Sequence, residues 1–116
     1  MAEPRWHFYE APGGGDPVRK DVADALGHDK KGRARLADLM ERIKTGATLP
    51  RDVKDLKRGL FEARLTHQGC EYRLFFAKEE GGLLLLGLHF ARKKAQTIKR
   101  AIDLARERLA DWDNRV

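Results

Sequence analysis

Apolar residues in the first half of the chain recur at helical spacing after a short aromatic stretch. Residues 5–10 alternate weakly and are rich in aromatic side chains, which is typical of a strand, and a proline with three glycines ends it. Asp16 and Pro17 then supply a helix cap and a first helical position, and apolar side chains keep to one stripe as far as Gly27. A second stripe of the same period covers residues 36–43. The first half therefore predicts a strand followed by two amphipathic helices.

In the second half of the chain the period changes from about 3.6 to 2. Apolar and polar side chains alternate over residues 61–66 and again over 72–77, and residues 67–69 supply a hairpin turn between them. After a Glu-Glu-Gly-Gly turn signal, the nearly continuous apolar run 83–90 is typical of a central strand covered on both faces. Apolar positions spaced three or four apart over residues 95–112 predict a last helix. The second half is thus a three-stranded antiparallel meander followed by a helix.

The order of these elements, a strand, two helices, three strands and a helix, predicts an α+β fold. We expect a small, mainly antiparallel sheet with the helices packed on one face. A length of 116 residues suits one domain, so we assign residues 1–116 to a single domain. If the apolar positions of the two alternating strands face the helices, then Glu62, Arg64 and Arg73 leave the opposite face, because successive side chains alternate across a strand.

Composition favours a folded protein with a highly charged surface. Charged residues make up 36% of the chain and hydrophobic residues 41%, which argues against disorder. The longest apolar stretch, residues 83–88, is far shorter than the ~20 residues of a membrane span, and the first residues lack the basic and apolar segments of a signal peptide. Cys70 is the single cysteine, which excludes an internal disulfide and a cysteine metal cluster. We therefore expect a cytoplasmic protein.

The net charge points to a polyanionic partner. The chain has 24 Lys and Arg residues against 18 Asp and Glu, a formal charge of +6 with a pI near 9.7, which favours nucleic acid as the partner. Two local clusters stand out, and they consist of Arg51, Lys54, Lys57 and Arg58, and of Arg92, Lys93, Lys94, Lys99 and Arg100.

Arg64 and Arg73 are the first candidates for chemistry. They lie on strands that we expect to pair, so their guanidinium groups can converge on one patch. A guanidinium is a planar fork of donors that binds a phosphate bidentately, most tightly when negative charge develops in a transition state. The alternative is a pair of surface salt bridges, for which Glu62 and Glu71 are the partners at hand. A nuclease site requires that both arginine side chains project from the same face of the sheet and that neither is paired with a carboxylate.

His89 is the second candidate, because it ends the last strand beside Arg92, Lys93 and Lys94. Neighbouring positive charge favours a neutral imidazole and a nearby phosphate favours the charged form, so His89 is a candidate acid or base in RNA cleavage. A structural histidine at a strand end is the alternative.

The basic segment 51–60 leads directly into the strand of Arg64. It can bring Lys54 and Lys57 to the rim of the same patch, where they would hold a phosphate backbone without reading sequence. A solvated charge run is the alternative. The other histidines show no metal-ligand spacing, so we expect no metal site.

Four stretches of the sequence carry a resemblance to a known family. They read LKRGLFEAR at residues 56–64, EYRLFF at 71–76, LLGLHFARKK at 85–94 and IKRAIDLA at 98–105. In this order they resemble the RelE/ParE toxin superfamily, and most closely its HigB-like, phage-derived group. No single stretch is unique to that group, whereas the ordered set is fairly specific and covers most of the chain.

The resemblance implies a RelE-like fold and the toxin of a type II toxin–antitoxin system. It further implies a ribosome-dependent mRNA endonuclease that inhibits translation. In such an enzyme a ribose 2′-OH attacks the adjacent phosphate and leaves a 2′,3′-cyclic phosphate and a 5′-OH, with no metal and no cofactor. The implied partners are a cognate antitoxin, which is a small DNA-binding protein, together with the ribosome and mRNA.

On the same resemblance, Arg64 and Arg73 match strand arginines that brace the phosphate and its developing charge. Lys57 matches a basic residue that contacts the phosphate, and His89 or Arg92 occupies the acid/base region. The residues implied to grip the RNA backbone are Lys54, Arg58, Lys93 and Lys94. RelE has a tyrosine shortly after the strand-end arginine and this chain has no aromatic residue there, so proton transfer to the leaving oxygen falls to His89 or to the ribosome.

Two other functions remain open. A ParE-like toxin poisons gyrase instead of cutting RNA, but that branch generally lacks a basic strand cluster with a histidine, so Arg73 and His89 favour cleavage. A non-catalytic nucleic-acid-binding module of phage origin would use the same basic surface.

Overall fold

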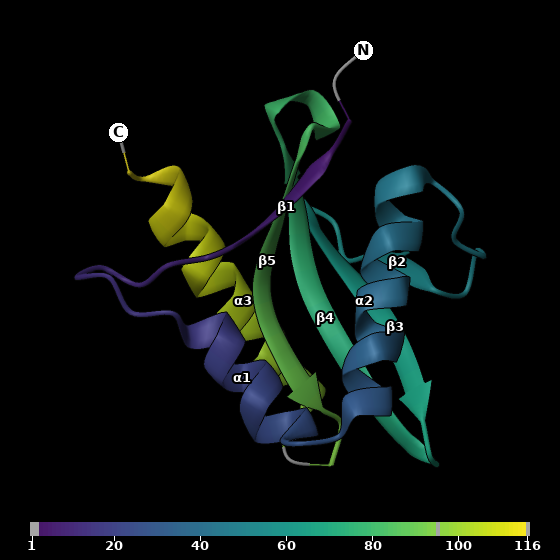
Figure 1. The fold of residues 1–116 in the computed structure, drawn as a ribbon. Coiled ribbons are helices and arrows are strands. Elements are labelled where there is room, and N and C mark those ends of the chain that lie inside the picture. The colour runs from purple at the N-terminus through teal and green to yellow at the C-terminus, as the bar shows by residue number, and fades with distance from the viewer. Residues whose placement is uncertain (1–2, 95, 116) are drawn as a thin grey trace.

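Five strands form a sheet of order β1-β5-β4-β3-β2 in the computed structural model, which describes residues 3–94 and 96–115 (Figure 1). The elements follow one another as β1 (Arg5–Phe8), α1 (Pro17–Leu26), α2 (Lys30–Thr45), β2 (Val53–Asp55), β3 (Leu60–His67), β4 (Cys70–Glu79), the short 3-10 helix η1 (Glu80–Gly82), β5 (Leu84–Arg92) and α3 (Ile98–Asp113). β1 runs parallel to β5, whereas the other neighbours are antiparallel. The predicted α+β fold with a mainly antiparallel sheet is confirmed.

β3, β4 and β5 form the predicted meander. Gln68 and Gly69 join β3 to β4 with φ values of 50° and 75°, the left-handed pair that a two-residue type I′ hairpin requires. The turn predicted at residues 67–69 is therefore confirmed. Between β4 and β5 the register shifts, because Phe75 pairs with His89 and Phe76 with Gly87. This bulge changes the direction of the side chains that follow it on β5.

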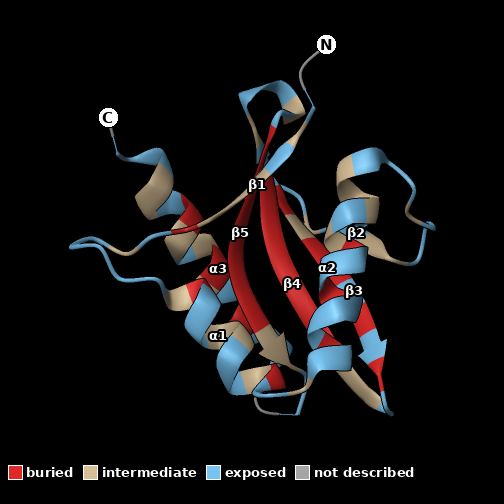
Figure 2. Cartoon of the chain, in the orientation of Figure 1, coloured by how far each residue is buried: buried red, intermediate tan, exposed pale blue. Residues whose placement is uncertain are grey.

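Helices cover both faces of the sheet, so the prediction that they pack on one face is wrong (Figures 1 and 2). α2 packs on one face, where Leu39 shares a core with Phe76, and α3 packs on the other, where Ala105 shares a core with Phe75. α1 lies beside β5 and supplies residues to both cores. The physical reason is in β4 and β5, which are buried along most of their length and apolar on both faces, so that both faces need cover.

The predicted alternation of β3 and β4 is confirmed. The apolar positions face α2 and lie in its core, and these are Ala63, Leu65, Tyr72, Leu74 and Phe76. Glu62, Arg64 and Arg73 therefore lie on the opposite face. Because α3 covers part of that face, Glu62 and Arg73 are buried, whereas Arg64 is exposed.

The ends of the helices agree with the sequence in most respects. α1 ends at Gly27, which has a φ of 52°, and α2 begins at Asp29, whose side chain accepts a hydrogen bond from the Gly32 amide at 2.8 Å. Asp16 precedes α1 as expected, but its carboxylate pairs with Arg19 at 2.8 Å and caps no amide. In the described part of the chain, no helix has both the length and the apolar character needed to cross a bilayer.

Candidate functional site

Arg64 on β3 and Arg73 on β4 lie directly opposite each other in the sheet. Opposed residues of paired strands project from the same face, so the first condition for a shared phosphate site is met. Both guanidinium groups reach the same carboxylate oxygen, Glu62 Oε1, which lies 3.2 Å from Arg64 Nε and 2.7 Å from Arg73 Nε. We refer to Arg64 and Arg73 as the arginine pair.

The second condition, freedom from carboxylates, is not met: Arg64 pairs with Glu62, and Arg73 pairs with Glu62 and Glu71, so only Arg64 keeps exposed donors. The Arg73 side chain is 8% exposed, and besides Glu62 it contacts Glu71, with Nη2 donating to Oε1 at 3.2 Å. The carboxylate pairing that we named as the alternative is thus observed for both arginines, at the surface for Arg64 and in a buried setting for Arg73. The Arg64 side chain is 43% exposed, and its one hydrogen bond to a described residue uses Nε. The outer nitrogens of Arg64 are therefore available to an anion.

Arg73 keeps one unused donor. Its Nη1 is buried and has no hydrogen-bond partner among the described residues. Arg73 lines a narrow hollow at the start of α3, beside Ile98 and Ala101. A buried charge is stable only where it is paired and hydrogen-bonded. Arg73 therefore fixes Glu62 and Glu71, and Glu62 in turn orients Arg64.

His89 lies on the same face as Arg73, two positions along the strands. It is opposite Phe75, and the two rings stack with their centroids 6.0 Å apart. His89 Nδ1 is 2.8 Å from Asp21 Oδ2, and Nε2 is 2.6 Å from Gln96 Oε1. A carboxylate on Nδ1 fixes the ring and its tautomer, which leaves Nε2 as the nitrogen that can exchange a proton with a ligand.

The residues that hold His89 were not predicted. Asp21 on α1 also accepts a hydrogen bond from Arg108 Nη1 at 2.9 Å, and Arg108 on α3 donates to the Leu88 carbonyl at 2.8 Å. Asp21 is 68 positions from His89 along the chain, so no local spacing relates them. The available signal was a charged residue within each apolar stripe, since Asp21 and Arg108 lie three residues after Val18 and Ala105.

The His89 cluster and the arginine pair adjoin. His89, Asp21 and Asp24 line a hollow of about 350 Å³ to which Arg92 and Gln96 also contribute. Arg92 and Gln96 line the narrow hollow at Arg73 as well. The His89 side chain is only 5% exposed, which agrees with the structural histidine named as the alternative, and Arg64 lines neither hollow. His89 on β5 and Arg64 on β3 thus lie on one face of the sheet with Arg73 on β4 between them. Within residues 3–94 and 96–115, no three His, Cys, Asp or Glu side chains gather as a metal site.

Of the two other predicted catalytic residues, Lys57 lies apart from the arginine pair, whereas Arg92 lines the hollow at Arg73. Lys57 is in the turn before β3, with its side chain 82% exposed, and at ~3.3 Å per residue it lies roughly 13 Å or more along the strand from Arg64. Arg92 pairs in register with Tyr72, so it leaves the sheet on the α2 face, where its Nη2 contacts Cys70 Sγ at 3.0 Å. Burial is the main cause that raises the pKa of Tyr72, which keeps its hydroxyl protonated.

The four residues expected to grip RNA are all exposed, and two of them flank the arginine pair. Lys54 on β2 pairs with Glu62 and so lies on the same face. Lys93 follows β5 and reaches Glu71, with Nζ 3.4 Å from Oε2. Lys94 lines a hollow of about 390 Å³ with Lys93, and Arg58 lies in the β2–β3 turn.

Comparisons with known proteins identify a family and a fold. A family model described as "Phage derived protein Gp49-like (DUF891)" matches residues 24–110, which is most of the chain. The fold is similar to that of the E. coli toxin RelE, in the free-state structure of a double arginine-to-alanine mutant, with a TM-score of 0.56 and 10% sequence identity. That alignment covers 89% of this chain and 97% of the RelE chain. No curated protein matches the sequence.

Proposed function

Since the chain belongs to the Gp49-like family of phage-derived proteins and has the fold of RelE, we propose that it is the toxin of a type II toxin–antitoxin system. The activity that we assign to it is ribosome-dependent endonucleolytic cleavage of mRNA, which stops translation. One observation carries the assignment: the exposed Arg64 and the carboxylate-oriented His89 lie on the same face of the sheet, with Arg73 and its carboxylates between them.

The proposed reaction is an internal transesterification of RNA. The ribose 2′-oxygen attacks the neighbouring phosphorus, the bond from phosphorus to the 5′-oxygen breaks, and the products have a 2′,3′-cyclic phosphate and a 5′-OH. The 2′-OH gives up a proton and the leaving 5′-oxygen receives one. Arg64 donates to the non-bridging phosphate oxygens, where negative charge increases in the transition state. Arg73 acts through Glu62 and is a positioning residue.

His89 is the residue assigned to proton transfer. Its Nδ1 is held by Asp21, so Nε2 exchanges the proton after Gln96 has moved aside to admit the substrate. Lys57 is too far from the arginine pair to share in this step. Arg92 borders the hollows at His89 and Arg73, but its guanidinium is held at Cys70 on the α2 face. Lys57 and Arg92 belong instead to the basic surface that holds RNA, together with Lys54, Arg58, Lys93 and Lys94.

The partners follow from the activity. A protein that stops translation requires an inhibitor in its own cell, so we assign it a cognate antitoxin, a small DNA-binding protein. The substrate complex is mRNA on the ribosome. The net charge of the chain, +6, favours its association with mRNA and with the RNA of the ribosome at low ionic strength.

Mapping of RNA ends in a translation extract tests this proposal. The purified protein is added with a reporter mRNA, and an identical mRNA without a ribosome-binding site serves as the control. Ends inside translated codons, absent from the control, support the proposal. Gyrase supercoiling is measured in parallel. If the mRNA stays intact and gyrase is blocked, the protein has a ParE-like activity; if the mRNA stays intact and gyrase is active, it is a non-catalytic binding module. Either result contradicts the nuclease proposal.

A further inference from the structure

A second concave surface lies on the other side of Arg64, between α2, the loop that follows it and the exposed edge of β3. The hollow has a volume of about 530 Å³. Four arginines from three separate segments line it, and we call it the arginine groove: Arg35, Arg42, Arg51 and Arg64. Arg64 thus belongs both to the groove and to the arginine pair.

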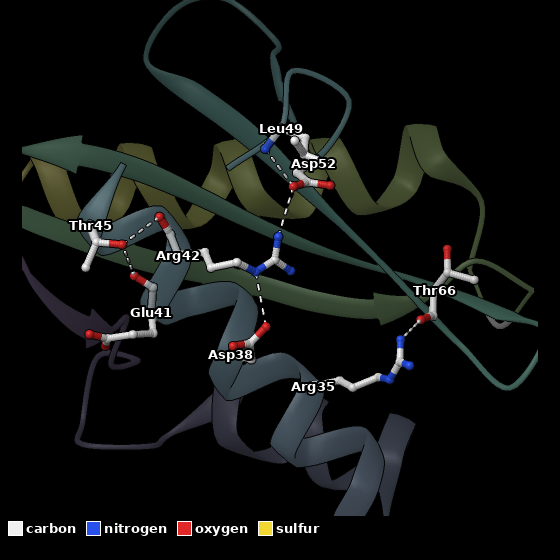
Figure 3. A network of polar contacts seen from close by, with 8 residues as sticks. All are labelled: Arg35, Asp38, Glu41, Arg42, Thr45, Leu49, Asp52 and Thr66. Atoms are coloured by element: carbon white, nitrogen blue, oxygen red, sulfur yellow. Dashed lines mark hydrogen bonds and ion pairs between the residues drawn. The ribbon is translucent and has the colours of Figure 1, made fainter. Parts of the chain in front are cut away.

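The groove has a fixed wall. Arg42 bridges two carboxylates, with Nε 3.1 Å from Asp38 and Nη1 3.0 Å from Asp52 (Figure 3). Asp52 also accepts a hydrogen bond from the Leu49 amide at 2.8 Å, which ties the loop after α2 to the helix. Arg42 is therefore structural, and the loop that it holds carries Arg51 into the groove.

Each acidic residue of the groove has a basic partner. Its two carboxylates belong to Asp52, which pairs with Arg42, and Glu71, which pairs with Arg73 and Lys93. Arg35 and Arg51 have no ion-pair partner in the described part of the chain, and both are exposed. The one hydrogen bond of the Arg35 side chain there is to the Thr66 carbonyl at 3.3 Å (Figure 3). The groove therefore presents unpaired positive charge.

The dimensions fit a chain of phosphates better than a single anion. Arg35 and Arg42 are seven residues apart on α2, which is about 10 Å along the helix. Along the axis of a duplex each strand has one phosphate per ~3.4 Å, and in an extended single strand successive phosphates lie farther apart, so this distance accommodates more than one phosphate. None of the lining residues is aromatic, which leaves no platform for stacking a base. Such a surface contacts the backbone and is indifferent to sequence.

We propose that the arginine groove binds the phosphate backbone of single-stranded RNA and leads it to the arginine pair. Arg35 and Arg51 supply the contacts, and Arg64, at the inner end, is shared with the scissile phosphate. This inference rests on the proposed function, because it gives the substrate RNA a path to that same site.

Binding of an RNA that cannot be cleaved tests the groove separately from catalysis. The probe is a short, fluorescein-labelled, single-stranded 2′-O-methyl RNA, which lacks the attacking hydroxyl, and affinity is measured by fluorescence anisotropy over a series of salt concentrations. The double variant R35Q/R51Q is compared with K20Q/K30Q, which removes the same charge from exposed positions of α1 and of the start of α2.

The groove variant is expected to bind about tenfold more weakly and to lower the slope of log K against log salt by about 1.4, since each single-strand contact accounts for ~0.7. The control is expected to stay close to wild type. The proposal that the groove binds RNA would be overturned if both variants lost RNA affinity equally, if neither lost any, or if wild type did not bind the RNA. Intact RNA binding by R35Q/R51Q together with lost binding of an acidic peptide would also overturn it and would assign the groove to a protein. Uncut mRNA in the translation extract refutes the nuclease alone.

Discussion

Arg64 and Arg73 hydrogen-bond to one oxygen of Glu62, although Arg64 is at the surface and Arg73 is buried beneath α3. Arg73, Glu62 and Glu71 are held by one another, and Glu62 in turn orients Arg64. With Lys93, three cations surround two carboxylates, so the cluster stays positive after all its pairs are made. This relationship gives the two arginines different roles.

Replacing Arg73 is expected to destabilise the fold. Arg73→Ala leaves Glu62, 4% exposed, without its shorter ion pair, and losing one partner of a buried pair costs about 3–5 kcal/mol. Urea unfolding measures this loss. The double variant Glu62→Gln/Arg73→Ala should recover part of it, because no carboxylate is then buried unpaired. A loss no greater than that of the exposed Arg100→Ala would show that the pair is not buried as described.

Replacing Asp21 is expected to reduce cleavage through His89. Asp21→Asn removes the charge that orients His89 and contacts Arg108, and loss of such an orienting partner typically costs 10- to 100-fold in activity. The matched control is Asp24→Asn, which lines the same hollow and makes no ion pair with a described residue. Fragment yield and its pH profile are the measurements. Equal cleavage rates for the two variants would show that Asp21 does not orient His89 for catalysis.

Gly87 is expected to tolerate no side chain. A Cβ at this position would lie 2.6 Å from Phe8 Cδ1, where β1 pairs with β5. Gly87→Ala should therefore lower the free energy of unfolding by about 1–3 kcal/mol, the range for overpacked sites. Gly15→Ala is the control, because its Cβ would make an ordinary 3.5 Å contact with Ala11. Equal stability of the two variants would contradict the close packing of β1.

Asp29 is expected to make stability fall in acid. The Gly32 amide, and then His67, lower the pKa of Asp29 by hydrogen bonding to its carboxylate. Its folded-state pKa lies below the unfolded value of about 3.9, so its contribution is complete above that value and is lost as the pH falls through the folded pKa. The free energy of unfolding of wild type should fall relative to that of Asp29→Asn as the pH drops through this acid range. A difference unchanged down to about pH 2 would refute this linkage.

Much of the sheet could be predicted from the sequence because its signals are local. The turn at Gln68–Gly69 fixes the β3–β4 register, and a fixed register places Arg64 opposite Arg73. The alternation of β3 and β4 then correctly separates the α2 core from the charged face. The pairing of Arg73 with Glu62 and Glu71 was also visible as an alternative.

The rest depends on contacts between distant segments. The apolar run 83–90 indicated a strand covered on both faces. The position of α3 over the charged face, which buries Arg73, depends on contacts between several segments, so no local pattern predicts it. The hydrogen bond between Asp21 and His89 joins two elements 68 residues apart. The short edge strand β2 has only three residues, too few for a period to be recognised.

The end chemistry of mRNA fragments formed on purified ribosomes tests the central claim, that Arg64 binds the scissile phosphate. Wild type and the control variant Lys20→Ala, which removes an exposed positive charge from α1, should release fragments whose 5′-OH is labelled by polynucleotide kinase without prior phosphatase treatment. Arg64→Ala should lower their yield by about 100-fold while the free energy of unfolding stays close to that of wild type, since the Arg64 side chain is 43% exposed. Full yield from Arg64→Ala, or uncut mRNA with wild type, would contradict the account.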